Sequence, residues 1–249
     1  MKVLITGSNG FIGRHLYHRL QDIGDIEILT FNRTDNLDLL TRHVERADAI
    51  VHLAGEMRPK NSEDLFAVNV DLTRIICDLL QKYGNEKFII LASSIQAEQD
   101  NLYGVSKRKA ENLIINLSLD FRTRIAVYRL PHVFGKWNKP NYNSVIATFC
   151  HNIARGLPIR VDDPAAIITP VFIDDVVNDF ISSLNTRQSG INIRKVSPEY
   201  SISVGDLAKV LSSFSKSGDV RVIEESWDGL LRALHTTYIS YLPNANFIK

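Results

Sequence analysis

Two kinds of hydrophobic pattern alternate along the first half of the chain. Short, almost wholly apolar runs are typical of strands that are buried on both faces of a parallel sheet. These runs are 2–6 (KVLIT), 26–31 (IEILTF), 48–55 (DAIVHLAG), 87–94 (KFIILASS) and 123–131 (TRIAVYRLP). The segments with apolar residues at helical spacing are 11–23, 62–83 and 104–118. The alternation predicts an α/β fold with a doubly wound parallel sheet between helices.

The pattern changes beyond this region. A polar and aromatic segment, a helix and one more strand are predicted at 136–144 (KWNKPNYNS), 145–159 and 191–197 (INIRKVS). A chain of 249 residues with 45% hydrophobic content can bury one α/β domain and a small additional lobe. We therefore predict a main domain over residues 1–135 and a smaller lobe over residues 136–249, interleaved with late sheet elements.

Charge and composition limit the classes of molecule that the chain is expected to bind. Lys and Arg number 29 against 28 acidic residues, so no net field favours nucleic acid or a membrane surface, and we expect a small-molecule ligand. The chain has neither a signal-peptide pattern nor an apolar run of about 18 residues, which predicts a cytoplasmic protein. Cys77 and Cys150 lie in apolar helical stretches and are expected in the core. Asp174 and Asp175 fit a helix N-cap and first turn better than a metal site, and no metal is expected.

A glycine cluster follows the first predicted strand. The segment TGSNGFIG contains Gly7, Gly10 and Gly13, and a helix begins at its end. Glycines permit a tight turn and close backbone approach, and a helix N-terminus offers free N–H groups to a pyrophosphate. The strand before and the helix after it predict a Rossmann-type dinucleotide site rather than a structural turn. The residues expected to contact the cofactor are Gly7, Asn9, Gly10, Phe11, Ile12 and Gly13.

The end of the second predicted strand indicates which dinucleotide binds. An acidic residue there would bind a ribose 2′-hydroxyl, whereas an Arg would accommodate a 2′-phosphate. Arg33 occupies this place in TFNRTDN, and Asp35 lies slightly beyond it. The pattern favours NADPH over NADH, with an ordinary solvated loop residue as the alternative for Arg33.

A Tyr and a Lys are spaced four residues apart in LYGVSK. Positions four apart share one face of a helix, so Lys107 can stand beside Tyr103. A nearby cation favours the phenolate and is expected to lower the tyrosine pKa from about 10. Ser94, at the end of the strand KFIILASS, could hydrogen-bond the substrate oxygen that Tyr103 protonates. The three residues predict a proton donor for carbonyl reduction.

These motifs make the chain resemble an extended-type short-chain dehydrogenase/reductase along nearly its whole length. The resemblance implies cofactor contacts from VHLAG (Leu53, Ala54, Gly55), from Asn69 in FAVNV, from Pro131 in YRLPHVFG, and from Tyr103 and Lys107. Two features depart from the family pattern. Ser94 precedes Tyr103 by a shorter connection than usual, and His132 replaces a common asparagine.

A narrower resemblance concerns the segments SSIQAEQDNLYGVSK, FGKWNKPNYNSVIATFCHNIARGLPI and TTYISYLP. They are similar to the reductase domain of the capsular-polysaccharide enzymes of the CapF/FnlB/WbjC type. The resemblance implies NADPH-dependent reduction of the C4 keto group of a UDP-2-acetamido-2,6-dideoxy-hexos-4-ulose, on the route to UDP-N-acetyl-L-fucosamine in capsule or O-antigen synthesis. Such enzymes carry a C-terminal cupin domain, and we expect none here because the chain stops at Lys249 with no room for one. Epimerisation of the adjacent ring carbon is therefore not expected of it.

Four residues are expected to contact the substrate. Asn141 and Asn143 are short hydrogen-bonding residues before a helix, suited to a uracil edge or a diphosphate, or else parts of a solvated turn. Arg58 and His132 could face the same substrate, although surface exposure and simple packing are the respective alternatives. Ile95 and Gln96 stand where related dehydratases place an acid, which disfavours dehydration.

Two alternative functions and a homodimer are also considered from the sequence. An NAD-dependent UDP-sugar 4-epimerase and a non-catalytic NADP-binding regulatory protein remain as alternatives. The apolar residues on more than one face of 71–83 also predict a homodimer that pairs through the helices at 62–82 and 104–118.

Overall fold

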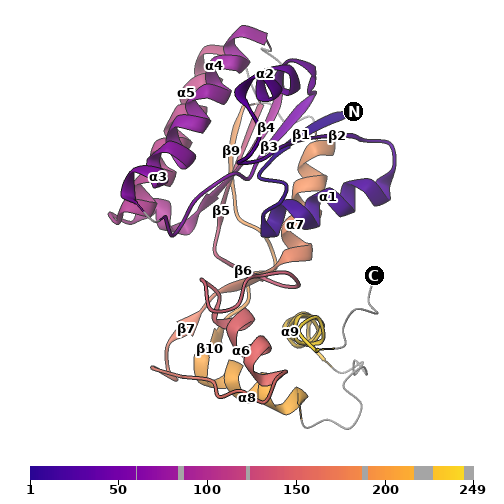
Figure 1. Ribbon diagram of the computed structural model, residues 1–249, viewed down its shortest axis with the longest axis vertical. Coiled ribbons are helices and arrows are strands. Elements are labelled where there is room, and N and C mark those ends of the chain that lie inside the picture. Colours follow the sequence, from indigo (N-terminus) through magenta and orange to yellow (C-terminus); the bar gives the residue numbers. More distant parts are fainter. Residues whose placement is uncertain (60, 84–86, 122–123, 187–189, 216–226, 244–249) are drawn as a thin grey trace. The chain divides into compact units, whose positions relative to one another are not determined.

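The computed structural model describes residues 1–59, 61–83, 87–121, 124–186, 190–215 and 227–243 (Figure 1). A six-stranded parallel sheet has the order β2-β1-β3-β4-β5-β9. The strands are β1 (Lys2–Thr6), β2 (Glu27–Phe31), β3 (Ala49–His52), β4 (Phe88–Ser94), β5 (Arg124–Leu130) and β9 (Ile191–Arg194). The predicted doubly wound parallel sheet is confirmed.

Helices cover both faces of this sheet (Figure 1). One face carries α2 (Leu37–Arg46), α4 (Leu72–Tyr83) and α5 (Leu102–Phe121), whose apolar residues share a buried core with the strands. The other carries α1 (Phe11–Ile23) and α7 (Ile173–Asn185), and the Phe180 ring packs edge-on against Tyr128. Helix α2 was not predicted from the sequence. It begins after Asn36, whose side chain accepts a hydrogen bond from the Leu39 amide at 2.9 Å.

The helix predicted over 62–83 has a change of winding in its middle. It begins as α3 (Ser62–Phe66), passes through a π-helical turn, η1 (Ala67–Asp71), and continues as α4. Such turns interrupt α-helices locally and are frequent at functional sites. The hydrophobic pattern of the sequence does not reveal it, because the flanking helices keep their usual spacing.

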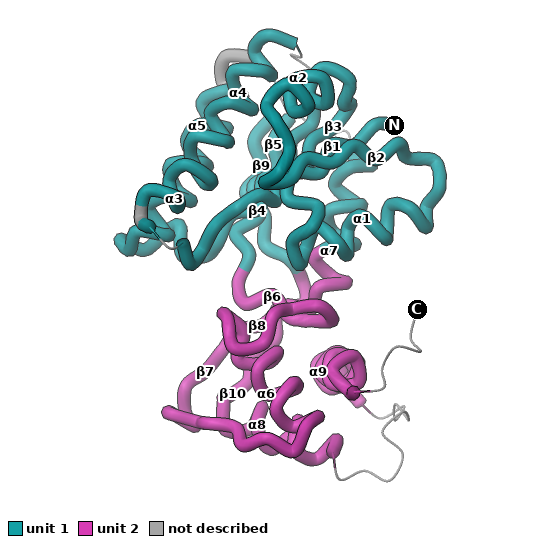
Figure 2. The backbone as a smooth tube through the Cα atoms, viewed as in Figure 1, with its two compact units in different colours: residues 1–130, 177–196 teal, residues 131–176, 197–249 magenta. Residues whose placement is uncertain are grey.

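The chain divides into two compact units (Figure 2). Unit 1 comprises Met1–Leu130 and Val177–Val196, and unit 2 comprises Pro131–Val176 and Ser197–Lys249. The first boundary lies five residues before the predicted one because β6 (His132–Phe134) pairs with β8 (Pro170–Phe172) in a small separate sheet. Val177–Val196 belongs to unit 1 because β9 extends the large sheet. The cofactor and substrate roles of the two units stay predictions.

Unit 2 has its own apolar core. Its further elements are α6 (Val145–Ile153), β7 (Ile167–Ile168), β10 (Ile202–Ser203), α8 (Val204–Phe214) and α9 (Gly229–Ile239), with β7 and β10 antiparallel. The helix predicted over 145–159 ends at Ile153, since Gly156 has a φ of 64° and Pro158 follows.

Cys77 and Cys150 are buried free thiols, as predicted. Helix α7 begins at Ile173, so both Asp174 and Asp175 lie in its first turn and neither is the N-cap. Among the described residues, no group of three or more His, Cys, Asp or Glu side chains could hold a metal ion. In the same part of the chain, no helix is both long and apolar enough to cross a membrane.

Candidate active site

The glycine turn after β1 packs directly on the loop after β3. Gly7 has a φ of 72°, and a Cβ on it would lie 2.8 Å from the Ala54 nitrogen. A Cβ on Gly13 would overlap the Gly7 carbonyl oxygen and lie 2.7 Å from the Ser8 Cα. Only glycine fits at these two positions. Since β1 lies between β2 and β3, this contact is at the point where the sheet reverses its winding, where open α/β sheets bind ligands.

The N-terminus of α1 suits an anionic group. Its N-cap is Gly10, which provides no side-chain hydrogen bond, and its first turn contains no acidic residue. The backbone N–H groups of that turn and the helix dipole therefore favour a phosphate. The turn thus fits the diphosphate of a dinucleotide, and all six predicted contacts in it stay predictions: Gly7, Asn9, Gly10, Phe11, Ile12 and Gly13.

Asn32, which the sequence analysis missed, ties the glycine turn to the end of β2. Its Oδ1 accepts hydrogen bonds from the Ser8 hydroxyl at 3.2 Å and from the Asn9 amide at 3.0 Å. The backbone N–H of Asn32 in turn donates to Asp35 Oδ2 at 2.7 Å. The next residue, Arg33, is 77% exposed and pairs with Glu56 at 2.8 Å. The guanidinium is therefore at the predicted strand end, already held by a carboxylate from the loop after β3.

A buried hydrogen-bond chain crosses the sheet behind these loops. The His52 ring, at the end of β3, lies 2.6 Å from Thr6 Oγ1 through Nδ1 and 2.9 Å from Thr73 Oγ1 through Nε2. Thr73 donates its own proton to the Asn69 carbonyl at 2.8 Å, so we assign the ring proton to Nε2. Burial, helped by the charge of Lys107, lowers the His52 pKa from 6.5 to about 3. The ring is thus neutral at physiological pH.

Asn69, on the π turn, clamps two parts of the site together. Its Oδ1 accepts from the Glu56 amide, and its Nδ2 donates to the Glu56 carbonyl, both at 2.8 Å. The same Nδ2 donates to Ser106 Oγ at 2.9 Å, and Ser106 donates to the Tyr103 carbonyl at 2.7 Å. Asn69 is 2% exposed. It therefore fixes the loop after β3 against the first turn of α5.

The structure brings Ser94, Tyr103 and Lys107 together at the carboxyl end of β4. Ser94 ends the strand, is buried, and forms a side-chain hydrogen bond with Tyr103 in the first turn of α5. Lys107 Nζ lies 6.0 Å from the centre of the Tyr103 ring and donates to the Ala92 carbonyl at 3.0 Å. A Cβ on Gly55 would lie 3.1 Å from the same Nζ, which puts the ammonium beside the loop after β3.

The expected lowering of the Tyr103 pKa by Lys107 is wrong for this arrangement. Burial raises the Tyr103 pKa, and it is the hydrogen bond with Ser94 that lowers it in part. Lys107 is itself buried, which lowers its pKa to about 8, although the Glu111 carboxylate acts in the opposite direction. The sequence could not reveal these burial effects, because they depend on how α5 packs on the sheet.

The other predicted residues are spread over both units. In unit 1, Leu53, Ala54 and Gly55 form the loop after β3, and the Arg58 amide donates to Glu56 Oε1 at 3.1 Å. Pro131, His132, Asn141 and Asn143 belong to unit 2. Asn141 has a φ of 55° and donates its amide to Thr148 Oγ1 at 3.0 Å, while Ser144 caps α6. The substrate roles of Arg58, His132, Asn141 and Asn143 stay predictions.

The glycine turn at the winding reversal and the Ser-Tyr-Lys group define a nicotinamide-dinucleotide enzyme of the short-chain dehydrogenase/reductase type. Residues 3–196 match the NAD dependent epimerase/dehydratase family, and the chain belongs to it.

Two relatives are similar to nearly the whole chain. The chain is 43% identical to the UDP-2-acetamido-2,6-beta-L-arabino-hexul-4-ose reductase of Pseudomonas aeruginosa, over 99% of this chain and 66% of that protein. The capsular polysaccharide assembling protein CapF of Staphylococcus aureus is 34% identical with a TM-score of 0.86, over 100% of this chain and 67% of that chain. The chain thus spans about two thirds of both relatives. The resemblance predicted from the sequence is confirmed.

A more distant neighbour shows the fold alone. The UDP-glucose 4-epimerase of Thermus thermophilus, in a complex with NAD, is 20% identical with a TM-score of 0.77, over 97% of this chain and 99% of that chain.

Proposed function

We propose that this chain reduces the C4 keto group of a UDP-linked 2-acetamido-2,6-dideoxy-hexos-4-ulose with NADPH, in capsular polysaccharide or O-antigen synthesis. The observation that carries the proposal is the Ser94–Tyr103 hydrogen bond with Lys107 one helical turn further on. The substrate class rests on the names of the Pseudomonas aeruginosa and Staphylococcus aureus relatives.

The cofactor would be held by the glycine turn, the N-terminus of α1 and the loop after β3, and when bound it supplies a hydride. The choice of NADPH rests on Arg33, because a guanidinium can bind a 2′-phosphate through two parallel hydrogen bonds. The Arg33 side chain is exposed, which supports this choice, and its ion pair with Glu56 would compete with the phosphate.

Tyr103 is the proton donor to the substrate oxygen. Its raised pKa keeps the phenol protonated at neutral pH, as a reduction requires. When the proton leaves, negative charge develops on the phenolic oxygen. The Ser94 hydroxyl can donate to that oxygen, and the Lys107 ammonium offsets its charge in a site shielded from water.

The test is Tyr103→Phe, assayed by NADPH oxidation with the UDP-linked 4-keto sugar. We expect kcat to fall on the order of 10²- to 10⁴-fold, the range for losing a general acid, with little change in the Kd for NADPH. Tyr83→Phe is the matched control, because Tyr83 ends α4 a few residues before β4 begins, whereas the proposed site lies where β4 ends. Near wild-type kcat for Tyr103→Phe would refute the assignment.

The same assay separates the two alternatives. A reductase consumes one NADPH for each sugar reduced, whereas an epimerase returns its hydride and shows no net consumption. A regulatory protein would bind NADPH without turning it over. Product analysis by NMR then identifies the new hydroxyl group at C4.

A further inference from the structure

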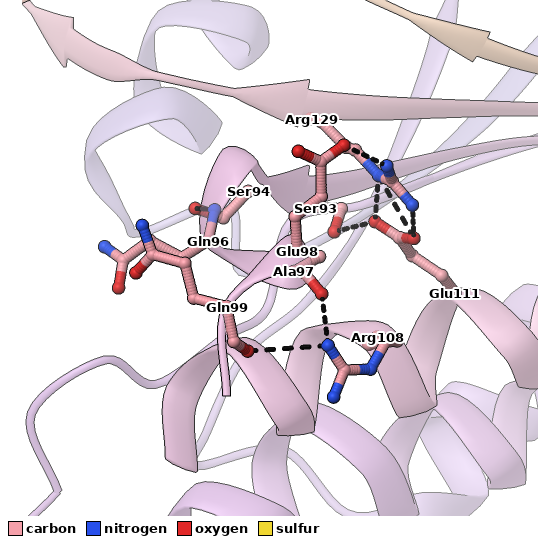
Figure 3. Close-up of polar contacts among 9 residues, drawn as sticks. All are labelled: Ser93, Ser94, Gln96, Ala97, Glu98, Gln99, Arg108, Glu111 and Arg129. Carbon is pink, nitrogen blue, oxygen red and sulfur yellow. Dashed lines mark hydrogen bonds and ion pairs between the residues drawn. The ribbon is translucent and has the colours of Figure 1, made fainter. Parts of the chain in front are cut away.

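A buried carboxylate that takes no part in the steps above lies one turn beyond Lys107 on α5. Glu111 is 1% exposed and accepts a hydrogen bond of 2.5 Å from the Ser93 hydroxyl. Arg129 on β5 donates to it through Nη2 at 2.7 Å and through Nε at 3.1 Å (Figure 3). Burying a carboxylate is costly unless it is paired, and this one is paired on both sides.

Glu111 completes a regular pattern of contacts between β4 and α5. Tyr103, Lys107 and Glu111 follow one another at intervals of four residues on one face of the helix. Each is bonded to one of the last three residues of β4: Lys107 to the Ala92 carbonyl, Glu111 to the Ser93 hydroxyl, and Tyr103 to the Ser94 side chain. The carboxylate is thus built into the same strand–helix contact as the two proposed catalytic groups.

We propose that Glu111 is a positioning residue, an inference that rests on the proposed function. Its carboxylate, held by Arg129, provides the counter-charge for Lys107 and fixes α5 against the end of β4. Its role is indirect, because it reaches the reacting atoms only through Lys107 and Ser93.

The charges around Lys107 determine the direction in which Glu111 shifts the Lys107 pKa. Among the described residues, the titratable groups that face the ammonium are Tyr103 and Glu111 on α5 and the neutral His52 on β3. Strand β4 adds an uncharged carbonyl and hydroxyl groups. Arg129 acts on Lys107 from β5 through their shared partner, Glu111. Only the Glu111 carboxylate therefore opposes the tendency of burial to discharge Lys107.

Arg129 also links Glu111 to the turn that follows Ser94. Its Nη1 donates at 2.8 Å to Glu98, the last residue of the 3-10 turn η2 (Ile95–Glu98). Arg108 holds the same turn by donating to the Ala97 carbonyl at 3.0 Å (Figure 3). Because Glu98 is 72% exposed and binds the same Arg129, it provides a matched comparison for Glu111.

The experiment compares Glu111→Gln, Arg129→Gln and Glu98→Gln by the pH dependence of kcat. Glu111→Gln removes the counter-charge and should move the alkaline limb to lower pH by about one unit, the lower end of the effect of an adjacent opposite charge. Arg129→Gln leaves Lys107 as the cation nearest to Glu111. The alkaline limb of kcat for this variant should therefore move to higher pH. Glu98→Gln should leave the limb in place. Melting temperatures establish that each variant is folded.

A purely structural role makes a different prediction: both Glu111→Gln and Arg129→Gln would lower kcat at every pH and leave the limb in place. That result, or shifts of the same sign in the two variants, would overturn the proposal. If either variant does not fold, the sign of the limb shift in the other one decides.

An NMR titration of protein labelled at the lysine ε carbons keeps this test separate from the proposed function. It measures the Lys107 pKa without turnover, and Lys107→Met assigns the resonance. If the wild-type chain does not oxidise NADPH with the sugar, the proposed function fails. The opposite pKa shifts in Glu111→Gln and Arg129→Gln are still expected in that case, and unchanged values would overturn the role of Glu111.

Discussion

Acidification should destabilise the folded chain through His52. Its pKa is about 3 in the folded state, against an ordinary value of 6.5. Between these values the unfolded chain binds a proton that the folded chain does not bind. The free energy of unfolding therefore rises with pH in this window. The contribution of the neutral ring is fully present above 6.5 and is lost progressively as the pH falls toward 3.

The magnitude follows from the two pKa values. Each pH unit within the window corresponds to about 1.4 kcal/mol, so the step from about pH 7.5 to about pH 5 should cost roughly 2 kcal/mol. The side chain is 1% exposed and both ring nitrogens are hydrogen-bonded, so solvent does not screen the effect. Roughly 2 kcal/mol is a large share of the stability of a typical domain.

The assay is denaturant unfolding followed by circular dichroism at both pH values, for the wild type and for His52→Gln. Other groups also titrate over this range, so the informative quantity is the pH-dependent loss of stability in the wild type minus that in the variant. His52→Gln should be less stable at the higher pH, by about 1 to 3 kcal/mol for its broken hydrogen bonds, but less sensitive to acid. His18→Gln, at an exposed position on α1, is the control. Equal losses in wild type and His52→Gln would refute the reasoning.

Three further predictions concern the cofactor and the assembly. Gly13→Ala would force a Cβ against the Gly7 carbonyl oxygen; it should cost about 1 to 3 kcal/mol in denaturant unfolding and weaken NADPH in titrations, and unchanged values would contradict the tight turn. Arg33→Ala should weaken NADPH several-fold with little effect on NADH, whereas Arg46→Ala should affect neither; equal losses for both cofactors would mean that Arg33 does not bind the phosphate. Light scattering should give twice the 28.1 kDa chain mass for the expected homodimer, and a monomer mass would exclude it.

The parts of the site that the sequence predicted are those set by local chain geometry. Gly7 and Gly13 follow a strand and precede a helix, and the Tyr103–Lys107 spacing places both residues on one helical face. These features need no knowledge of distant residues. The spacing of Glu111, a further four residues along, was visible too, but its meaning depended on Ser93 and Arg129.

Contacts between distant segments could not be predicted in the same way. The Arg33–Glu56 pair joins loops 23 residues apart, and the His52 chain joins three separate elements. The effect of burial on the Tyr103 pKa depends on the finished packing of α5. Sequence patterns indicate which residue types are available, whereas the tertiary fold decides which of them meet.

The π turn at Ala67–Asp71 has a consequence for insertions and deletions. Such a turn takes up one residue more than the α-helix that it interrupts, so the helical faces on either side can keep their phase. Deleting Val68 should then let α4 continue to bury Ile76 and Leu80 against the sheet. Asn69 would lose the bulged backbone from which it reaches Glu56 and Ser106. We therefore expect a shortened chain to stay folded while the loop after β3 loses its attachment to the first turn of α5.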